Sequence, residues 1–505
     1  MSIVVKETHA AVVVLFGERA YKLKKPVDFG FLDFTTRRAR LAACRREVEL
    51  NRRLAPDVYE GVADVRGPDG QACEHLVVMR RMPEERRLAT LVRVGSPVDE
   101  QLRAIARAVA GLHAASPHGP AIDHEGSVKA LHSRWTDSFD QVRGLPSPPI
   151  ERPVLDEIER LTLRFLDGRA SLFEARRSAG RIVDGHGDLL AEDIFCLDDG
   201  PRILDCLEFD DRLRYLDGLD DAAFLAMDLE RLGAPRLAER FLSWYAEFSG
   251  DPAPPALWHH YVAYRAFVRA KVACLRHWQG ETDTTGETRQ RAEAEAQARR
   301  LAELTLRHLR AGAVSLILVG GAPATGKSTM GMGLADRLGH TLLHSDRVRK
   351  ELAGLDPMKP APAPYRQGIY DAAHTEQTYA ELLSRAEKLL GMGESVILDA
   401  SWTARRHRDK AGEIATRAAA DLVQLRCTAM PQIIARRLAA RRPGLSDADP
   451  AISLAMAAGL DAWPAAVEID TGADLPNSIE RALEAVHPVE QKPSWCFRRP
   501  QLEPG

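Results

Sequence analysis

The sequence lacks the features that mark secreted, metal-binding and membrane proteins. Its seven cysteines are scattered and never form a CxxC pair, so we expect neither a zinc site nor a disulfide framework. No apolar run approaches the roughly 18 residues of a membrane span, and the first residues contain no apolar signal core. The net charge of −3 gives no bulk attraction to nucleic acid. These absences predict a cytoplasmic protein without a membrane partner, and they disfavour a nucleic-acid partner.

The chain is long enough for two or three domains. It has 505 residues, more than one ordinary domain contains. A charged, alanine-rich amphipathic segment at about 287–310 precedes a compact apolar run, Val314–Val319. We therefore place a boundary near residue 312 and predict domains over 1–311 and 312–488, followed by a tail over 489–505 that is rich in proline and polar residues.

The N-terminal part begins with strands and becomes helical. Ala11–Phe16 and Ala20–Lys24 flank Gly17-Glu18-Arg19, which predicts a β-hairpin. A helix over about Thr35–Leu54 and a strand over Leu76–Met79 follow, and the pattern is mostly helical after about residue 98. We expect a small β-rich lobe and a larger helical lobe, an α+β architecture.

The C-terminal part alternates between apolar strands and helical stretches. This rhythm predicts an α/β domain whose parallel sheet carries helices on both faces. The predicted strands are Val314–Val319, Thr341–His344, Ser395–Asp399, Leu422–Cys427 and Val467–Asp470.

A phosphate-binding motif follows the first of these strands. The segment from Gly321 to Thr329 fits G-x-x-x-x-G-K-[ST]. Its glycines let backbone N–H groups face phosphate oxygens, and the next helix adds its positive dipole end. Lys327 is expected to reach the β- and γ-phosphates of ATP, and Ser328 to bind Mg²⁺. The predicted nucleotide-binding residues here are Gly321, Ala322, Pro323, Ala324, Thr325, Gly326, Lys327, Ser328 and Thr329.

Further polar residues follow the other strands, where open α/β sheets bind ligands. Asp346 is positioned to take a proton from an acceptor hydroxyl, with Arg349 holding the acceptor; the alternative is that Asp346 only caps a helix. Asp399 ends an apolar run and is a candidate Mg²⁺ ligand. An arginine-rich stretch containing Arg437 and Arg441 is typical of a lid over the phosphates, and the spacing does not say which arginine acts.

The N-terminal part contains a second constellation. His186-Gly187-Asp188-Leu189 is followed by Asp193, the spacing at which a kinase base precedes a metal ligand. Asp205 follows a short apolar strand and is a further candidate metal ligand. Asp188 would orient the acceptor hydroxyl while Asp193 and Asp205 hold Mg²⁺.

A pair of lysines is expected to complete this site. Lys22 and Lys24 point to the same face of a strand, and one of them should reach the phosphates with Glu47 as its ion-pair partner. Glu208 has either a functional role or a structural pairing with an arginine. Aspartates also gather over 210–228, either as an acidic groove for a cationic acceptor or as solvated and paired side chains.

Both halves resemble known kinase families. The P-loop, Ser345-Asp346-x-x-Arg349 and Leu398-Asp399-Ala400 resemble P-loop kinases of the gluconate kinase, polynucleotide 5′-kinase and zeta-toxin type, over about 313–488. The catalytic-loop motif and Leu204-Asp205-Cys-Leu-Glu208-Phe209 resemble the aminoglycoside phosphotransferase-like kinases, which implies a protein-kinase-like bilobal fold. The whole chain is similar to bacterial proteins that join two such domains. The aminoglycoside phosphotransferase-like family usually has Asn where Asp193 stands and His where Leu190 stands.

The combined features predict an ATP- and Mg²⁺-dependent phosphotransferase with two nucleotide sites and small hydroxylated acceptors. Asp188 and Asp346 would be the respective bases. Two alternatives remain open: a nucleotide-sensing regulatory protein with a pseudokinase-like N-terminal domain, and a kinase for nucleic-acid ends or nucleotide sugars. A basic channel beside Asp346 with stacking aromatics such as Tyr365 or Trp402 would favour the latter. The acceptors and the oligomeric state cannot be read from the sequence.

Overall fold

The computed structural model describes residues 3–7, 10–28, 33–279, 288–357, 359, 367–440, 456, 459–472 and 474–486. Arg441, Tyr365 and the tail over 489–505 lie outside these residues. The chain divides into two compact units. The first comprises Met1–Glu151, Phe173–Ala253 and Tyr261–Thr305, and the second comprises Arg152–Leu172, Pro254–His260 and Leu306–Gly505.

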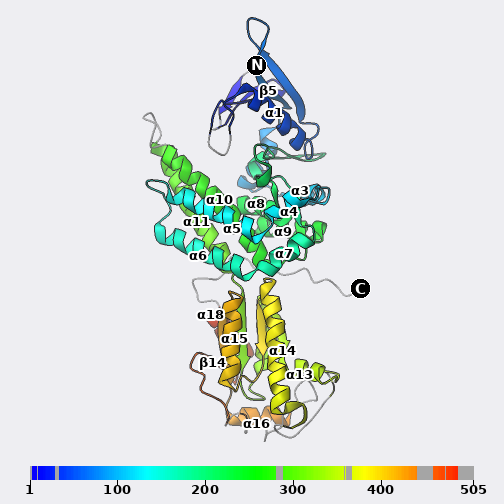
Figure 1. Ribbon diagram of the computed structural model, residues 1–505, viewed down its shortest axis with the longest axis vertical. Helices are drawn as coiled ribbons and strands as arrows, with labels where there is room; N and C mark the ends of the chain where they lie inside the picture. Colours follow the sequence, from blue (N-terminus) through cyan, green and yellow to red (C-terminus); the bar gives the residue numbers. More distant parts are fainter. Residues whose placement is uncertain are drawn as a thin grey trace. The chain divides into compact units, whose positions relative to one another are not determined.

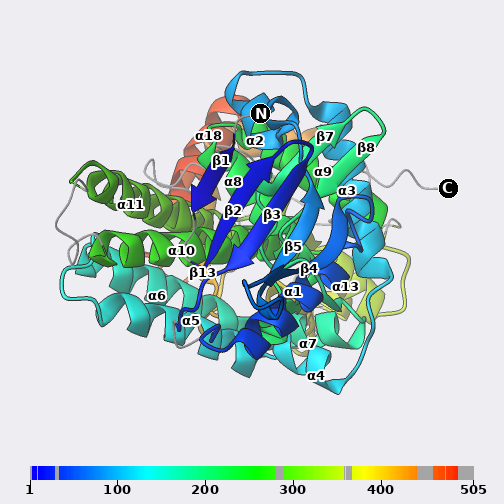
Figure 2. The ribbon, with the colours of Figure 1, turned by 90° about the horizontal axis from the view of Figure 1, so that it is seen from above.

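The first unit opens with a five-stranded antiparallel sheet, visible in Figure 2. The sheet order is β1 (Val4–Glu7), β2 (Ala11–Phe16), β3 (Arg19–Lys24), β5 (Ala72–Arg80) and β4 (Tyr59–Arg66). Helix α1 (Arg37–Asn51) begins where the Thr36 side chain accepts a hydrogen bond from the Ala39 N–H group, a standard N-cap. Cys44 and Val48 of α1 pack on Val77 and Met79 of β5, so this helix is fixed against the sheet.

Two short strand pairs hold the loops that carry the N-terminal motif. Strand β6 (Ile182–Asp184) pairs with β9 (Tyr215–Asp217), and β7 (Ile194–Leu197) pairs with β8 (Gly200–Ile203). The helices from α2 to α11 are α2 (Leu88–Arg93), α3 (Asp99–Ala114), α4 (Pro120–Glu125), α5 (Val128–Arg143), α6 (Arg152–Gly168), α7 (Ala170–Ser178), α8 (Gly218–Arg231), α9 (Pro235–Ser249), α10 (Pro255–Gln279) and α11 (Thr288–Ala311). Helix α6, the first residues of α7 and α10 and the last residues of α11 fall in the second unit. The described part of the first unit is a β-rich lobe followed by a helical one, as predicted.

The second unit contains a five-stranded parallel sheet flanked by helices (Figure 1). Its strand order is β11 (Thr341–His344), β12 (Val396–Asp399), β10 (Ser315–Gly320), β13 (Asp421–Thr428) and β14 (Val467–Asp470). The later helices are α12 (Lys327–Leu338), α13 (Ser345–Leu352), α14 (Ala372–Gly391), α15 (Arg405–Arg417), α16 (Pro431–Ala439) and α18 (Leu475–Val486).

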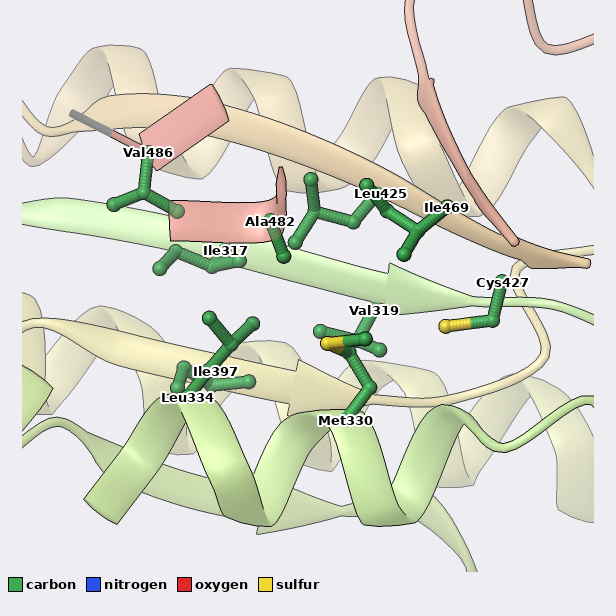
Figure 3. Close-up of a cluster of buried hydrophobic side chains, with 10 residues drawn as sticks. All are labelled: Ile317, Val319, Met330, Leu334, Ile397, Leu425, Cys427, Ile469, Ala482 and Val486. Carbon is green, nitrogen blue, oxygen red and sulfur yellow. The ribbon is translucent and has the colours of Figure 1, made fainter. Parts of the chain in front are cut away.

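The core of the second unit explains its continuous apolar strands. Every residue of β10 is buried, as expected for a central strand covered on both faces. Figure 3 shows Met330 and Leu334 of α12 facing Ile397 and Val319 of the sheet. This packing fixes the start of α12 directly after the loop that leaves β10.

The predicted α+β and α/β classes are confirmed, and β11 and β14 have the predicted bounds. The predicted helix over Thr35–Leu54 is observed as α1, shorter at both ends. Strands β1 and β4 were not predicted. Within the described part of the chain, no helix is long and apolar enough to cross a membrane.

Candidate functional site

A buried aspartate holds in place the loop that carries His186-Gly187-Asp188-Leu189, the predicted catalytic loop. Asp221 of α8 accepts hydrogen bonds from the backbone N–H groups of His186 (2.6 Å) and Gly187 (2.9 Å). The same carboxylate lies 2.9 Å from Nε2 of His113. Burial would raise the pKa of Asp221, but the hydrogen bond and charge of His113 hold it below its usual range. A Cβ on Gly185 would lie 2.4 Å from Asp221 Oδ2, so the close approach requires glycine.

The loop is also tied to the segment that carries Asp205. His186 Nε2 donates a hydrogen bond to the Leu204 carbonyl oxygen at 3.0 Å, and the Asp205 N–H group donates to Tyr59 Oη at 3.2 Å. Asp205 has a φ of 64°, in the left-handed region that non-glycine residues occupy rarely and often at functional sites. The fold therefore imposes an unusual backbone conformation to aim this carboxylate.

Both predicted lysines contact Glu47, but only one faces the rest of the site. Lys22 Nζ lies 2.9 Å from Glu47 Oε1 and 2.5 Å from Asp205 Oδ1. Lys24 Nζ lies 2.6 Å from Glu47 Oε2 and also pairs with Glu208. The Lys24 side chain is 2% exposed and that of Lys22 15%. Lys22 is therefore the lysine beside Asp205, and Glu208 pairs with a lysine rather than an arginine.

Three carboxylates in this site influence one another. Burial raises the pKa of Asp188 to about 6, with arginines opposing and Asp205 adding to the rise. Burial, Asp205 and Asp188 raise the pKa of Asp193 well above its usual range. The Lys22 ammonium holds the pKa of Asp205 below its usual value. This excess of negative charge fits a divalent cation, although no group of three His, Cys, Asp or Glu side chains among the described residues is by itself arranged to hold a metal.

The aspartates over 210–228 form no acidic groove, because each has a partner. Asp217 and Asp220 bind buried arginines, Arg176 and Arg265 respectively, and Asp221 holds the catalytic loop. Asp210 pairs with Arg212, Asp211 with Arg214 and Arg46, and Asp228 with Arg231.

The P-loop has the geometry that its motif predicts. Gly321 has a φ of 139°, and a Cβ there would lie 2.6 Å from the Cys427 carbonyl oxygen. Gly326 has a φ of 87° and precedes α12, which has no side-chain cap. Thr325 Oγ1 donates to the Ala322 carbonyl oxygen at 2.8 Å, which closes the loop. The N-terminal N–H groups of α12 are thus left for a phosphate ligand.

Asp399 lies at the end of β12, beside the start of α12. His344 Nδ1 donates a hydrogen bond to Asp399 Oδ2 at 2.8 Å, while Oδ1 is buried with no hydrogen-bond partner. Burial would raise the pKa of Asp399, but His344, Lys327 and Ser328 hold it below its usual value. An ionised, buried oxygen beside a serine hydroxyl fits the oxygen ligands that Mg²⁺ prefers.

Asp346 does not cap its helix. The N-cap of α13 is His344, and Asp346 lies in the first turn, half-buried. Arg349 donates from Nη1 to the Ile369 carbonyl oxygen (3.0 Å) and to Thr375 Oγ1 (3.2 Å). These bonds connect Arg349 to the start of α14, while its Nε is buried without a hydrogen-bond partner.

Of the two predicted lid arginines, Arg437 lies at the P-loop. Its guanidinium donates to Thr471 Oγ1 at 3.0 Å and to the Thr471 carbonyl oxygen at 2.6 Å. A Cβ on Gly326 would lie 3.3 Å from Arg437 Nη1. Arg441 lies outside the described residues, so its role stays a prediction.

Several residues that shape these sites were missed from the sequence. For Asp221, one of the aspartates over 210–228, the sequence left open an acidic groove or solvated and paired side chains, because its partner His113 lies far from it in the chain. His344 was expected only as the last residue of a strand; its place at that strand end, opposite Asp399, was the available signal. Thr471 follows the last strand and hydrogen-bonds the Thr325 carbonyl oxygen at 2.6 Å.

Comparison with known proteins places the chain in a family. Residues 316–462 match the family model described as AAA domain, which agrees with the predicted P-loop domain. The chain is 43% identical to the uncharacterized protein Rv2004c of Mycobacterium tuberculosis over 478 residues, 95% of this chain and 94% of that protein. It belongs to the same family as that mycobacterial protein.

Two solved structures are also similar to parts of the chain. A sugar kinase from Janibacter sp. is 19% identical, covers 36% of this chain and 97% of its own, and has a TM-score of 0.28. A choline/ethanolamine kinase family protein from Mesorhizobium loti is 14% identical, covers 61% of this chain and 92% of its own, and has a TM-score of 0.37.

Proposed function

We propose that the chain is an ATP- and Mg²⁺-dependent phosphotransferase with two nucleotide sites, each acting on an alcohol group of a small molecule. The observation that carries the proposal is the P-loop before α12, with Asp399 beside Lys327 and Ser328. The loop leaves the first N–H groups of the helix without a side-chain cap, and it is followed by a lysine and lies beside a carboxylate that can bind a metal ion. This arrangement suits the phosphates of a nucleoside triphosphate.

In the second unit, different residues bind the phosphates, accept the proton of the acceptor hydroxyl and hold the metal ion. Lys327 and the first N–H groups of α12 hold the phosphates, and Arg437 approaches them from α16. The side chain of Asp346 forms no hydrogen bond or ion pair with any described residue, so its carboxylate is available to accept the proton of an acceptor hydroxyl. Ser328 and Asp399 would hold Mg²⁺, which supplies charge neutralisation on the phosphates.

In the first unit, Lys22 holds the phosphates while Glu47 fixes its position. Asp188 accepts the hydroxyl proton, and its pKa of about 6 leaves it ionised at neutral pH but close to the range where a base is effective. Asp193 and Asp205 are the residues that would hold Mg²⁺.

Two residues bear on the alternative functions, a kinase for nucleic-acid ends and a nucleotide-sensing regulatory protein. Trp402 is completely buried and is not available to stack on a base, which disfavours a kinase for nucleic-acid ends. The regulatory alternative rests on Asp193, whose extra negative charge beside Asp188 and Asp205 distinguishes this site.

The test is ATP consumption by the full chain with a panel of small hydroxylated metabolites. Wild type, Asp188→Asn and Lys327→Ala are compared, since each variant disables one site. Two-site transfer predicts that each variant loses activity toward a different subset of acceptors. If Asp188→Asn leaves every ATP-consuming activity intact, transfer in the first unit is refuted and the regulatory alternative is favoured.

A further inference from the structure

A histidine and an aspartate lie opposite each other at the carboxyl ends of two neighbouring strands in the second unit. His344 ends β11, Asp399 ends β12, and the two residues are partners in the parallel register of these strands. His344 Nδ1 lies 2.8 Å from Asp399 Oδ2, and the exposed fractions of the two side chains are 18% and 6%. The bond is therefore largely shielded from water, where a hydrogen bond to a charged group is stronger than at the surface.

This hydrogen bond fixes the rotation of the Asp399 carboxylate. An ionised carboxylate only accepts hydrogen bonds, so Nδ1 of His344 carries the proton of the pair. The donor does not depend on the charge of the ring, because the imidazolium also has a proton on Nδ1. An aspartate that nothing holds rotates broadly about its terminal torsion. The bond to Oδ2 therefore decides where Oδ1 points.

The other oxygen of Asp399 has no hydrogen-bond partner among the described residues. Oδ1 is buried, and a buried ionised oxygen is costly unless a donor or a cation meets it. Helix α12 packs against this aspartate, since a Cβ on Gly331 would lie 3.9 Å from Asp399 Cβ. Ser328, the predicted Mg²⁺ ligand, precedes Gly331 by three residues and falls on the same side of α12. The unpaired oxygen thus belongs to the aspartate that faces the Ser328 side of this helix.

The His344 ring has no role in the helix that follows it. His344 is the N-cap residue of α13, but its side chain makes no capping hydrogen bond. The ring is also poorly suited to bind Mg²⁺ itself, because that ion prefers oxygen ligands and a nitrogen that carries a proton cannot bind a metal. What the ring does provide is the hydrogen bond to Asp399.

We propose that His344 is a positioning residue for the metal site of the second unit: by holding Asp399 Oδ2, it keeps Oδ1 available for the Mg²⁺ that accompanies the nucleotide. The inference rests on the proposed role of Asp399 in holding Mg²⁺. Hydrogen-bond partners of metal-binding side chains strongly affect metal affinity, and their loss weakens binding about ten- to a hundredfold. The effect of His344 should therefore appear only when Mg²⁺ is present and only when Asp399 is there to be held.

The experiment measures nucleotide binding by the second unit in the full chain. A non-hydrolysable ATP analogue is titrated calorimetrically in the Lys22→Met background, which disables the nucleotide site of the first unit. Each variant is measured with saturating Mg²⁺ and with a chelator, and the ratio of the two dissociation constants is its Mg²⁺ gain. His344→Leu removes the donor, whereas His344→Asn keeps an N–H donor on the atom bonded to Cγ, as Nδ1 is. His374→Leu is the matched control, because His374 Nδ1 bonds Asp371 at 2.9 Å at the exposed start of α14.

We expect His344→Leu to weaken binding about ten- to a hundredfold with Mg²⁺ and to leave binding in the chelator unchanged. His344→Asn should restore most of the Mg²⁺ gain, and His374→Leu should leave it intact. An unchanged Mg²⁺ gain in His344→Leu overturns the proposal. An equal loss with and without Mg²⁺, which marks a purely structural effect, also overturns it, as does a His344→Asn variant as impaired as His344→Leu or a loss of the same size in His374→Leu.

A double variant separates the role of His344 from failure of the metal site itself. Asp399→Ala should reduce the Mg²⁺ gain, and His344→Leu added to it should reduce the gain no further, because His344 acts through Asp399. Independent, additive losses overturn the proposal. If the parent chain binds no analogue, or binds it without a Mg²⁺ gain, the proposed metal site fails and the positioning role fails with it. A normal gain that His344→Leu does not change overturns the positioning role alone.

Discussion

Lys22 and the buried Glu47 form an ion pair, in which Nζ lies 2.9 Å from Oε1. Glu47 binds Lys24 through its other oxygen, so one carboxylate orients two lysines on the same strand. The second contact of each lysine separates their roles. Lys22 also forms an ion pair with Asp205, at the predicted metal site. Lys24 instead forms its second ion pair with Glu208 and is buried.

Replacement of the two lysines should therefore have different consequences. Lys22→Met removes the proposed phosphate contact and should lower kcat/KM for ATP at the first site by at least about a hundredfold, with little change in stability. Lys24→Met leaves Glu47 and Glu208 short of a buried cation and should lower the free energy of unfolding by about 3 kcal/mol. Kinetics in the Lys327→Ala background and denaturant unfolding measure the two effects. Equal kinetic effects without a stability difference would contradict this assignment.

The P-loop should not tolerate a side chain at its first glycine. In Gly321→Ala the new Cβ would lie 2.6 Å from the Cys427 carbonyl oxygen, at a φ of 139°, so the loop must shift and nucleotide binding by the second unit should be lost. Gly339→Ala is the matched control. That glycine also has a positive φ, 69°, but a Cβ there meets nothing within 4 Å.

The control should cost about 1–2 kcal/mol of stability from backbone strain while nucleotide binding is retained. Titration of an ATP analogue into each variant in the Lys22→Met background measures binding by the second unit alone. Retention of binding in Gly321→Ala would show that the loop does not need this backbone conformation.

The first site should depend on pH through Asp188. A base must be ionised, and burial raises the pKa of this carboxyl to about 6. The value of kcat/KM should be level above pH 7 and fall about tenfold per pH unit below pH 6, as protonation removes the base. The profile is measured in the Lys327→Ala background. An activity that stays level from pH 7 down to pH 4.5 would rule out a base with this pKa.

A buried arginine network should dominate the stability of the helical lobe. Arg176 binds Asp217 at 2.6 Å and Asp251 at 2.5 Å, and the side chains of all three are at most 7% exposed. Arg176→Met leaves two buried carboxylates unpaired and should lower the free energy of unfolding by about 3–5 kcal/mol. Arg212→Gln, which breaks an exposed pair with Asp210, should cost less than about 0.5 kcal/mol. Similar losses for both variants in denaturant unfolding would contradict this ranking.

The sequence predicted those features that depend on local pattern. Strand β10 and the P-loop after it could be identified because an apolar run and a glycine motif are contiguous. The placement of Lys22 and Lys24 on one face followed from strand alternation, and Glu47 contacts both. Strands β1 and β4 were missed because exposed or intermediate positions dominate them, so they carry little apolar signal.

What could not be predicted depends on contacts between distant segments. Nothing local distinguishes Asp221, which holds the catalytic loop, from Asp210, which pairs with an exposed arginine. The choice between Lys22 and Lys24 required the position of Asp205, far along the chain.

The central claim is that one chain carries two nucleotide sites, and binding stoichiometry tests it most directly. Calorimetric titration of the full chain with a non-hydrolysable ATP analogue and Mg²⁺ should give two molecules bound per chain. Lys327→Ala and Lys22→Met should each give one, and the double variant none. A stoichiometry of one for the wild type, abolished by Lys327→Ala and unaffected by Lys22→Met, would contradict the account.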